Sequence, residues 1–330
     1  MNKQKVLLIT HDQDGTGQLL AKSLEKIGQP YHVIDLSTFP NKATATIDYN
    51  SNLASVSFSC PSGSFRSHEV KSVWWRRPRG KITPQTSSPI GKYIALESEI
   101  FINSLFRLLK NSRWVSDPDN TRIANSKPLQ LSLAKEIGFN IPNTIISNDP
   151  AVVKDFILSN NVPLTMKPVG SSYVRVSDDE NFESENLAIF TRVIDKNQFL
   201  SHLDLVKNCP IILQEAIVDK IDLRITVVDD ICFPVSIVHT ADHGAGDSNL
   251  DWRNHKLNRI YSMCEIPDSL KKMCVNLTRQ LGLNFGAIDM CFSEEKGYYF
   301  FEINPQGQWV PSEVLAGHPI SSALANYLSK

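Results

Sequence analysis

Three oxygen-bearing side chains near the end of the sequence have the types and spacing of a metal site. The stretch FEINPQGQW, residues 301–309, carries Glu302 and Asn304 two positions apart, and strand alternation points both to one face. Asp289 lies in the apolar stretch FGAIDMCF, where a buried carboxylate needs a partner. Mg²⁺ accepts such ligands when nucleotide phosphates complete its octahedron. Spacing alone leaves open a structural alternative, in which Asp289 pairs with an arginine and Glu302 is solvated at a strand end.

A second group of polar residues is spread along the chain before these positions. Taken singly, each member is better explained as a solvated lysine, a structural salt bridge or a charge at a strand edge. Lysine is found at the start of an expected helix and before a proline at the end of an apolar strand. The group consists of Lys127, Lys167, Gln214, Glu215, Asp222, Arg224 and Arg253.

The glycines that follow the first apolar run do not complete a nucleotide-binding motif. Gly15 and Gly17 fit the start of a Rossmann fingerprint, but Leu20 stands where the third glycine belongs. The sequence also lacks the GxxxxGK[ST] pattern of a P-loop. An ordinary turn from strand to helix is therefore the favoured interpretation over a nicotinamide-binding site.

Composition narrows the class of protein. The 330 residues are 42% hydrophobic and 21% charged, as in globular proteins, and this length predicts two or three domains. A formal net charge of −1 gives no field that attracts nucleic acid or an anionic membrane, so we expect neither partner. The N-terminal apolar run is too short for a signal peptide, and no run approaches a membrane span. Six scattered cysteines without a CxxC pair predict reduced thiols and a cytoplasmic protein.

Hydrophobic periodicity predicts an α/β domain in the first third of the chain. Strands are expected at 5–10, 31–36, 43–48, 53–59 and 70–78, with helices over 15–28 and about 90–109. Trp74 and Trp75 are adjacent on one of these strands, so they should face opposite sides. The turn-rich stretch SDPDN at 116–120 marks the expected domain boundary.

The rest of the chain predicts two α+β lobes. A helix capped by Ser126 and stopped by Gly138 comes first, and the polar stretch 170–198 is expected to be a hairpin or a mobile loop. Two further hairpins are expected, across Asp229 and Asp230 and across the turn SEEKG. The expected strands are 142–147, 163–170, 211–217, 222–228, 231–238, 285–292 and 298–304, and the expected helices are 126–138, 149–158 and 267–282.

The order of these residues resembles that of the ATP-grasp ligases over residues 125–328. The shared order is a lysine, a strand with KP, a strand with QE-x-I, then D-x-R, an aspartate and E-x-N. Several phrases resemble one branch, the graspetide synthetases, which are microviridin-type peptide macrocyclases. These phrases are VWWRRP at 73–78, LQEAIVDKIDLRITVVDD at 213–230, LDWR at 250–253 and FEINPQGQW at 301–309.

The resemblance implies ATP and Mg²⁺ as cofactors and assigns residues to each. The expected nucleotide-binding residues are Lys127, Lys167, Gln214, Glu215, Ile217 and Asp222. The two lysines would neutralise phosphates. The segment from Gln214 to Ile217 would recognise adenine at an interdomain hinge, and Asp222 would contact the ribose or the phosphate side.

The resemblance also implies which residues bind metal and promote the reaction. Asp289, Glu302 and Asn304 would hold Mg²⁺ that bridges the β- and γ-phosphates. Arg224 and Arg253 would stabilise charge on the transferring phosphoryl group and then on the tetrahedral oxyanion. The chemistry proceeds through an acyl phosphate, so it requires no protein nucleophile.

The implied partner is a ribosomal precursor peptide with a leader and an acidic core. Its Asp or Glu side chains would be joined to Ser or Thr hydroxyls as esters, or to Lys as amides. The leader would dock near the polar stretch 171–194. Homodimers are common in this group, so a homodimer is a further expectation.

Two rival functions remain open from the sequence. The first is an intermolecular ATP-grasp ligase like the ribosomal-protein glutamate ligases, against which VWWRRP and the ending at Gln308 and Trp309 count. The second is a peptide- or nucleotide-binding module without activity, which would not need the metal ligands.

The expected fold is an ATP-grasp fold of the α/β and α+β classes with an N-terminal α/β pre-ATP-grasp domain. Residues 1–120 would form that domain, 121–212 the central lobe, and 213–330 the C-terminal lobe with the metal site. The nucleotide would lie between the strand of Lys167 and the strand of Glu302.

Overall fold

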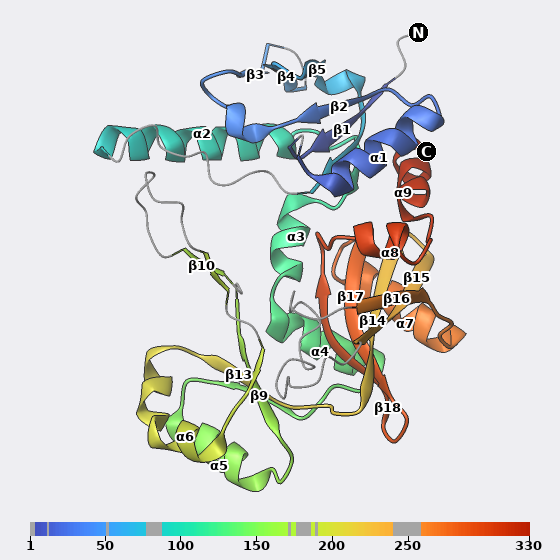
Figure 1. Ribbon diagram of the computed structural model, residues 1–330. Helices are drawn as coiled ribbons and strands as arrows, with labels where there is room; N and C mark the ends of the chain where they lie inside the picture. The colour runs from blue at the N-terminus through green and yellow to red at the C-terminus, as the bar shows by residue number, and fades with distance from the viewer. Residues whose placement is uncertain are drawn as a thin grey trace.

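The structure is a computed structural model that describes residues 4–11, 13–50, 53–76, 88–170, 173–175, 186–188, 191–239 and 259–330. It shows an N-terminal α/β domain, a central lobe and a C-terminal lobe (Figure 1). No helix within the described ranges is both long and apolar enough to cross a membrane.

The N-terminal domain confirms the predicted βαβ opening and the hairpin that follows it. A parallel sheet has the strand order β2-β1-β6-β7, and a separate antiparallel sheet has the order β3-β4-β5. Asp14 caps the first helix by accepting a hydrogen bond from the backbone of Thr16. The elements are β1 (Lys5–Ile9), α1 (Gly15–Lys26), β2 (Tyr31–Ile34), η1 (Leu36–Thr38), β3 (Thr44–Asp48), β4 (Ser55–Cys60), β5 (Gly63–Arg66), η2 (Ser67–Glu69), β6 (Val70–Trp75), α2 (Pro89–Arg107) and β7 (Arg113–Val115).

The stretch 116–120 is the start of a helix rather than a simple turn. Asp117 accepts hydrogen bonds from the backbone of Asp119 and Asn120, and it thereby caps α3 (Pro118–Ala124). The aspartate, proline and asparagine that mark a turn in a sequence are also N-terminal residues of helices, which explains the difference. In Figure 1, α3 runs from the N-terminal domain toward the other two lobes.

The central lobe contains an antiparallel sheet of order β12-β9-β13-β8. Within 170–198, β10 pairs with β11 as the expected hairpin requires, and residues 171–172, 176–185 and 189–190 lie outside the described ranges. Ser126 precedes its first helix but makes no side-chain capping bond, while Gly138 ends that helix with a φ of +105°, which favours glycine. In this part of the chain, α4 (Lys127–Ile137) packs against the C-terminal sheet through Leu131 and Ala134. The remaining elements are β8 (Thr144–Ser147), α5 (Pro150–Ser159), β9 (Leu164–Pro168), β10 (Tyr173–Arg175), β11 (Asn186–Ala188), β12 (Arg192–Val193), α6 (Lys196–Ser201), η3 (Leu203–Asn208) and β13 (Ile211–Glu215).

The C-terminal lobe is built on an antiparallel sheet of order β16-β15-β14-β17-β18. Both predicted hairpins are present, β14–β15 and β17–β18, whereas β16 and the two last helices were not predicted. The elements are β14 (Lys220–Val228), β15 (Ile231–His239), β16 (Arg259–Met263), α7 (Asp268–Gln280), β17 (Phe285–Ser293), β18 (Gly297–Asn304), α8 (Val310–Val314) and α9 (Ile320–Ser329).

The N-terminal and C-terminal parts share a hydrophobic core. Helix α9 lies against α1 in Figure 1, and Ser72 of β6 donates a hydrogen bond to the Leu328 carbonyl at 2.7 Å. Trp74 packs against Trp309, with ring centroids 5.6 Å apart. Trp75 instead packs against Phe106 in the core of the N-terminal domain. The prediction that the two adjacent tryptophans face opposite sides is therefore confirmed, and Trp74 faces the C-terminal lobe.

Candidate functional site

Three charged side chains line up across adjacent strands of the C-terminal sheet. The strand register pairs Arg224 of β14 with Asp289 of β17, and Asp289 with Glu302 of β18. Arg224 Nη1 donates to Asp289 Oδ1 at 2.7 Å in a buried ion pair. Leu223 and Ile225 alternate with Arg224 and enter the core that α7 covers. The charged row therefore lies on the sheet face opposite α7.

A β-bulge next to this row changes which face Phe301 occupies. Asp289 pairs with Glu302 while Met290 pairs with Phe300, so Phe301 is an extra residue in β18. Its ring lies 4.9 Å from Lys167 Nζ and 5.8 Å from Lys220 Nζ. Both distances are within cation–π range. Because Lys167 belongs to β9, the bulge brings the central and C-terminal sheets together at this point.

Lys127 joins the two lobes at the same place. Its ammonium group donates to the Pro168 carbonyl of β9 at 3.0 Å and lies 3.7 Å from Glu302 Oε2. The first position of α4 holds it there, as the sequence predicts. Lys127 and Arg224 thus offset the repulsion between Glu302 and Asp289, two carboxylates that the register places opposite each other.

The expected adenine-binding segment is firmly held at the end of β13. Gln214 is buried, accepts a hydrogen bond from Lys167 Nζ at 2.6 Å and donates to Thr144 Oγ1 at 2.8 Å. Glu215 Oε1 accepts from Lys296 Nζ at 2.7 Å, and this bond raises the pKa of Lys296. Ile217 is buried just beyond the strand. The side chain of Gln214 therefore contacts a predicted phosphate-binding lysine directly.

Asp222 and Cys291 lie beside each other on the charged face of the sheet. The register pairs them, and Asp222 forms a buried ion pair with Lys220. Burial raises the pKa of the Cys291 thiol to about 12, and the nearby ammonium of Lys220 only partly opposes that shift. Burial thus favours the neutral form of the Cys291 thiol.

Asn304 lies at the exposed end of β18, on the same face as Glu302. It pairs with Ala287, two positions before Asp289, so the strand alternation predicted from the sequence is confirmed. Its Oδ1 accepts a hydrogen bond from the backbone of Gln306 at 2.9 Å. Asp289, Glu302 and Asn304 thus present oxygen atoms from neighbouring strands.

The donor set fits Mg²⁺ provided that a nucleotide supplies further oxygens. In the described part of the chain, no three His, Cys, Asp or Glu side chains gather in a cluster that could hold a metal by themselves. Two carboxylates and a carboxamide are a partial shell of hard ligands, which suits an ion that usually retains substrate phosphates and water. When bound, Mg²⁺ neutralises phosphate charge and polarises the transferring group.

Several expected residues lie outside the described ranges. Arg253 and the phrase LDWR, Arg77, and most of the expected leader-docking stretch 171–194 belong to them. The structure therefore places Arg224 but not its expected catalytic partner.

Sequence reasoning missed several residues that the fold brings to the site. Lys220 was visible as a lysine two positions before Asp222, a spacing that places both on one face of a strand. The sequence did not indicate that Phe301 lies at the site, because its position there results from a β-bulge, which depends on strand pairing. Gln306 and Gly307 lie within the phrase that carries the family resemblance, but their contacts come from distant strands.

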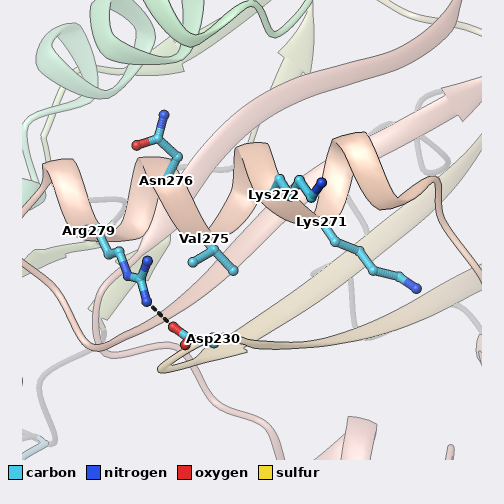
Figure 2. A pocket seen from close by; sticks show the side chains of 6 residues that line it. All are labelled: Asp230, Lys271, Lys272, Val275, Asn276 and Arg279. Carbon is cyan, nitrogen blue, oxygen red and sulfur yellow. Dashed lines mark hydrogen bonds and ion pairs between the residues drawn. The ribbon is translucent and has the colours of Figure 1, made fainter.

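A surface pocket of about 370 Å³ lies away from this site. Figure 2 shows that its lining comes from α7 and from Asp230 in the β14–β15 turn. Arg279 is already paired with Asp230, and Lys271 with Glu265 and Asp268. Because α7 covers the opposite face of the sheet, this pocket does not adjoin the charged row.

Comparisons with known proteins identify the families to which the two parts of the chain belong. A family model described as the MvdD pre-ATP-grasp domain matches residues 5–122, and one described as the RimK-like ATP-grasp domain matches residues 124–328. No curated protein sequence matches the chain significantly.

Solved structures similar to this chain include peptide-bound enzymes. The macrocyclase MdnC from Microcystis aeruginosa MRC, bound with precursor peptide MdnA, is 26% identical with a TM-score of 0.83, over 98% of this chain and 99% of that chain. A RiPP-associated ATP-grasp ligase of Chryseobacterium gregarium, in complex with ADP and a leader and core peptide, is 24% identical with a TM-score of 0.86, over 98% and 96%. The ligase PsnB, complexed with a minimal precursor, Mg and ADP, is 18% identical with a TM-score of 0.75, over 100% and 99%. The similarity to the last two structures, at 24% and 18% identity, shows a shared fold only.

Proposed function

Because this chain belongs to the ATP-grasp ligases through its RimK-like domain, we propose that it is a peptide macrocyclase of the graspetide type. It would activate Asp or Glu side chains of a ribosomal precursor peptide and join them to Ser or Thr hydroxyls or to Lys amines. ATP and Mg²⁺ are the cofactors of this family.

One observation carries the proposal: the row of Arg224, Asp289 and Glu302 meets Lys127 of α4, which packs on the C-terminal sheet, and Lys167 of β9 in the central lobe. Lys127 lies 3.7 Å from Glu302, and the Lys167 ammonium lies 4.9 Å from the ring of the adjacent Phe301. Cations from two lobes and carboxylates from one therefore meet between β9 and β18. This is the arrangement that an ATP phosphate chain with its metal requires.

The first chemical step transfers the γ-phosphoryl group of ATP to a peptide carboxylate. A carboxylate oxygen of the peptide forms a bond to the γ-phosphorus of ATP. At the same time the bond between the γ-phosphorus and the oxygen that bridges the β- and γ-phosphates breaks, which gives an acyl phosphate and ADP. Negative charge spreads over the equatorial oxygens, and fixed cations stabilise it. We assign that role to Arg224, which Asp289 holds in place, and to Arg253.

The second step forms the ring. A hydroxyl or amine of the same peptide attacks the acyl carbon, loses its proton, and inorganic phosphate leaves with the carboxyl oxygen. Each ring therefore costs the peptide one water molecule. No protein nucleophile takes part, in keeping with the burial that favours the neutral thiol of Cys291 on the same sheet face.

Two features favour a precursor peptide over the substrate of a glutamate ligase. The likeness to the macrocyclase MdnC extends over 98% of this chain, which includes the N-terminal domain. The match of residues 5–122 to the MvdD pre-ATP-grasp model points the same way. We propose that the leader docks near the β10–β11 hairpin, which projects from the central lobe in Figure 1.

The test is an intact-mass measurement. The protein is incubated with ATP, Mg²⁺ and an acidic peptide bearing Ser, Thr or Lys that is encoded beside its gene. We expect a peptide that has lost one or more water molecules, because each ring releases one. A peptide of unchanged mass while ATP is consumed would instead indicate an intermolecular ligase, and neither change would indicate a binding module.

We further propose a cytoplasmic homodimer that forms through α2. All six cysteines are free thiols, as expected in a reducing compartment. Opposite the face that α2 buries in its own domain, a second apolar face is exposed. Several large apolar side chains exposed on one helix are typical of an interaction surface, although Glu97 is exposed among them. This face consists of Ile90, Tyr93, Ile94, Leu96 and Ile100.

A second copy of α2 fits this face by charge. In an antiparallel, two-fold packing centred between residues 95 and 96, Lys92 lies opposite Glu99 of the partner, and Glu99 opposite Lys92. Both residues flank the apolar face on the same side of the helix. The packing is therefore complementary in charge at Lys92 and Glu99, while it places Ile94 opposite the exposed Glu97 of the partner.

Ile94→Glu should convert the dimer to a monomer, because it places a second carboxylate opposite Glu97 of the partner. Light scattering during gel filtration measures the mass. Val152→Glu is the matched control, since Val152 of α5 and Ile94 are both 47% exposed. A wild-type monomer, or a dimer that persists in Ile94→Glu, would contradict the proposal.

A further inference from the structure

The segment that follows the metal strand connects the site to the N-terminal domain. It runs from Asn304 at the end of β18 to Trp309, the N-cap residue of α8. Trp309 is fully buried between Trp74 of β6 and Phe285 of β17, and its indole N–H donates to Ser321 Oγ at 3.0 Å. The far end of the segment is therefore fixed in the core that the two parts share.

Gln306 makes two hydrogen bonds, one to the metal strand and one to the N-terminal domain. Its backbone N–H donates to Asn304 Oδ1 at 2.9 Å, and its side-chain amide donates to the Trp75 carbonyl at 3.3 Å. The first bond fixes the orientation of the Asn304 carboxamide. The second ties the same residue to the end of β6, which is a strand of the other domain.

The next two residues fix Arg224. A Cβ atom at Gly307 would lie 2.5 Å from Arg224 Nη2 and closer still to Ala287, so only glycine allows the chain to pass this near. The Gln308 carbonyl then accepts from Arg224 Nη2 at 3.4 Å. One short segment thus touches Asn304 on one side and Arg224 on the other.

We propose that Gln306 is a positioning residue through which the N-terminal domain holds Asn304 ready for Mg²⁺. The inference rests on the proposed metal site. Outer groups that orient a metal ligand contribute strongly to affinity, because an unrestrained carboxamide must be ordered when metal binds. The pre-ATP-grasp domain thus contributes to the metal site without contacting it.

Gln306→Glu tests this assignment because it keeps the size of the side chain and the backbone donor but removes the donor to Trp75. Titration calorimetry measures Mg²⁺ binding in saturating ADP, and ADP binding without metal. We expect Mg²⁺ to bind about tenfold more weakly, with ADP binding unchanged. In turnover, the apparent KM for Mg²⁺ should rise while kcat at saturating Mg²⁺ remains close to that of the wild type.

Gln280→Glu is the matched control, since Gln280 is an exposed glutamine of α7 on the far side of the sheet. Gln306→Leu provides a neutral variant if the new charge lowers the thermal midpoint. The assignment would be overturned if wild type and both Gln306 variants bound Mg²⁺ with equal affinity. It would also be overturned if the variants lost affinity for ADP as much as for Mg²⁺, or if the wild type did not bind Mg²⁺. None of these measurements needs a peptide, so they are separate from the test of macrocyclisation.

Discussion

Arg224→Ala should lower kcat for peptide-dependent ATP turnover by roughly 10²–10³-fold, the usual effect of removing one fixed donor from a transition state. Arg224 is 5% exposed, and its guanidinium is held between the Asp289 carboxylate and the Gln308 carbonyl. The donor is therefore already ordered before the reaction begins. Water that fills the space would stabilise the transferring charge less well, because it must reorient during the step.

The alanine variant also removes Arg224 from its buried ion pair with Asp289, and breaking a buried pair costs about 3–5 kcal/mol. Arg224→Lys separates stability from catalysis because it keeps a positive charge near Asp289 but loses the planar fork. We expect Arg224→Lys to lose most of the activity while its thermal midpoint stays closer to that of the wild type.

Arg107→Lys is the matched control for these measurements. Arg107 forms a two-bond pair with Asp119, at 2.7 and 2.8 Å, on the protein surface. Exposed pairs contribute little to stability, and this one is distant from the charged row. Full turnover by Arg224→Lys and Arg224→Ala would remove Arg224 from the mechanism.

Asp289→Asn and Glu302→Gln should each reduce Mg²⁺-dependent turnover by at least about 10²-fold. Loss of a group that only supports a metal ligand reduces activity by up to about 10²-fold, and loss of a ligand itself should have at least that effect. Each substitution keeps the shape of the side chain and removes one negative charge from the metal. The loss should be greater at low Mg²⁺ and partly recovered as Mg²⁺ is raised. Initial rates over a Mg²⁺ series measure this.

Thermal unfolding in EDTA distinguishes a metal ligand from a purely structural ion pair. Asp289 and Glu302 face each other in register, so Glu302→Gln removes a repulsion along with the long 3.7 Å contact to Lys127. Its thermal midpoint without metal should therefore be no lower than that of the wild type. Asp230→Asn, at an exposed ion pair, is the control. Wild-type rates in Asp289→Asn or Glu302→Gln would refute the metal assignment.

Local pattern was sufficient for much of the fold. The alternation of FGAIDMCF and YYFFEIN predicts a hairpin with polar residues on one face, and β17 and β18 pair as expected. The shift to helical spacing predicts α4 and α7, because periods of two and of 3.6 residues are properties of the chain itself. The local sequence pattern did not predict α3, because the residues that cap this helix are also typical of turns.

The sequence by itself determined the identity and order of the chemical groups. These are the lysines, Asp222 followed two positions later by Arg224, and the strand with Glu302 and Asn304. The tertiary structure decided which of them meet. Arg224 and Asp289 are 65 positions apart, and their ion pair depends on strand register. The bulge that turns Phe301 toward two lysines, and the contact of Gln306 with Trp75 across 231 positions, depend on it as well. A periodic pattern states which face a side chain takes, but the partner on that face is set by packing between elements that are distant in the chain.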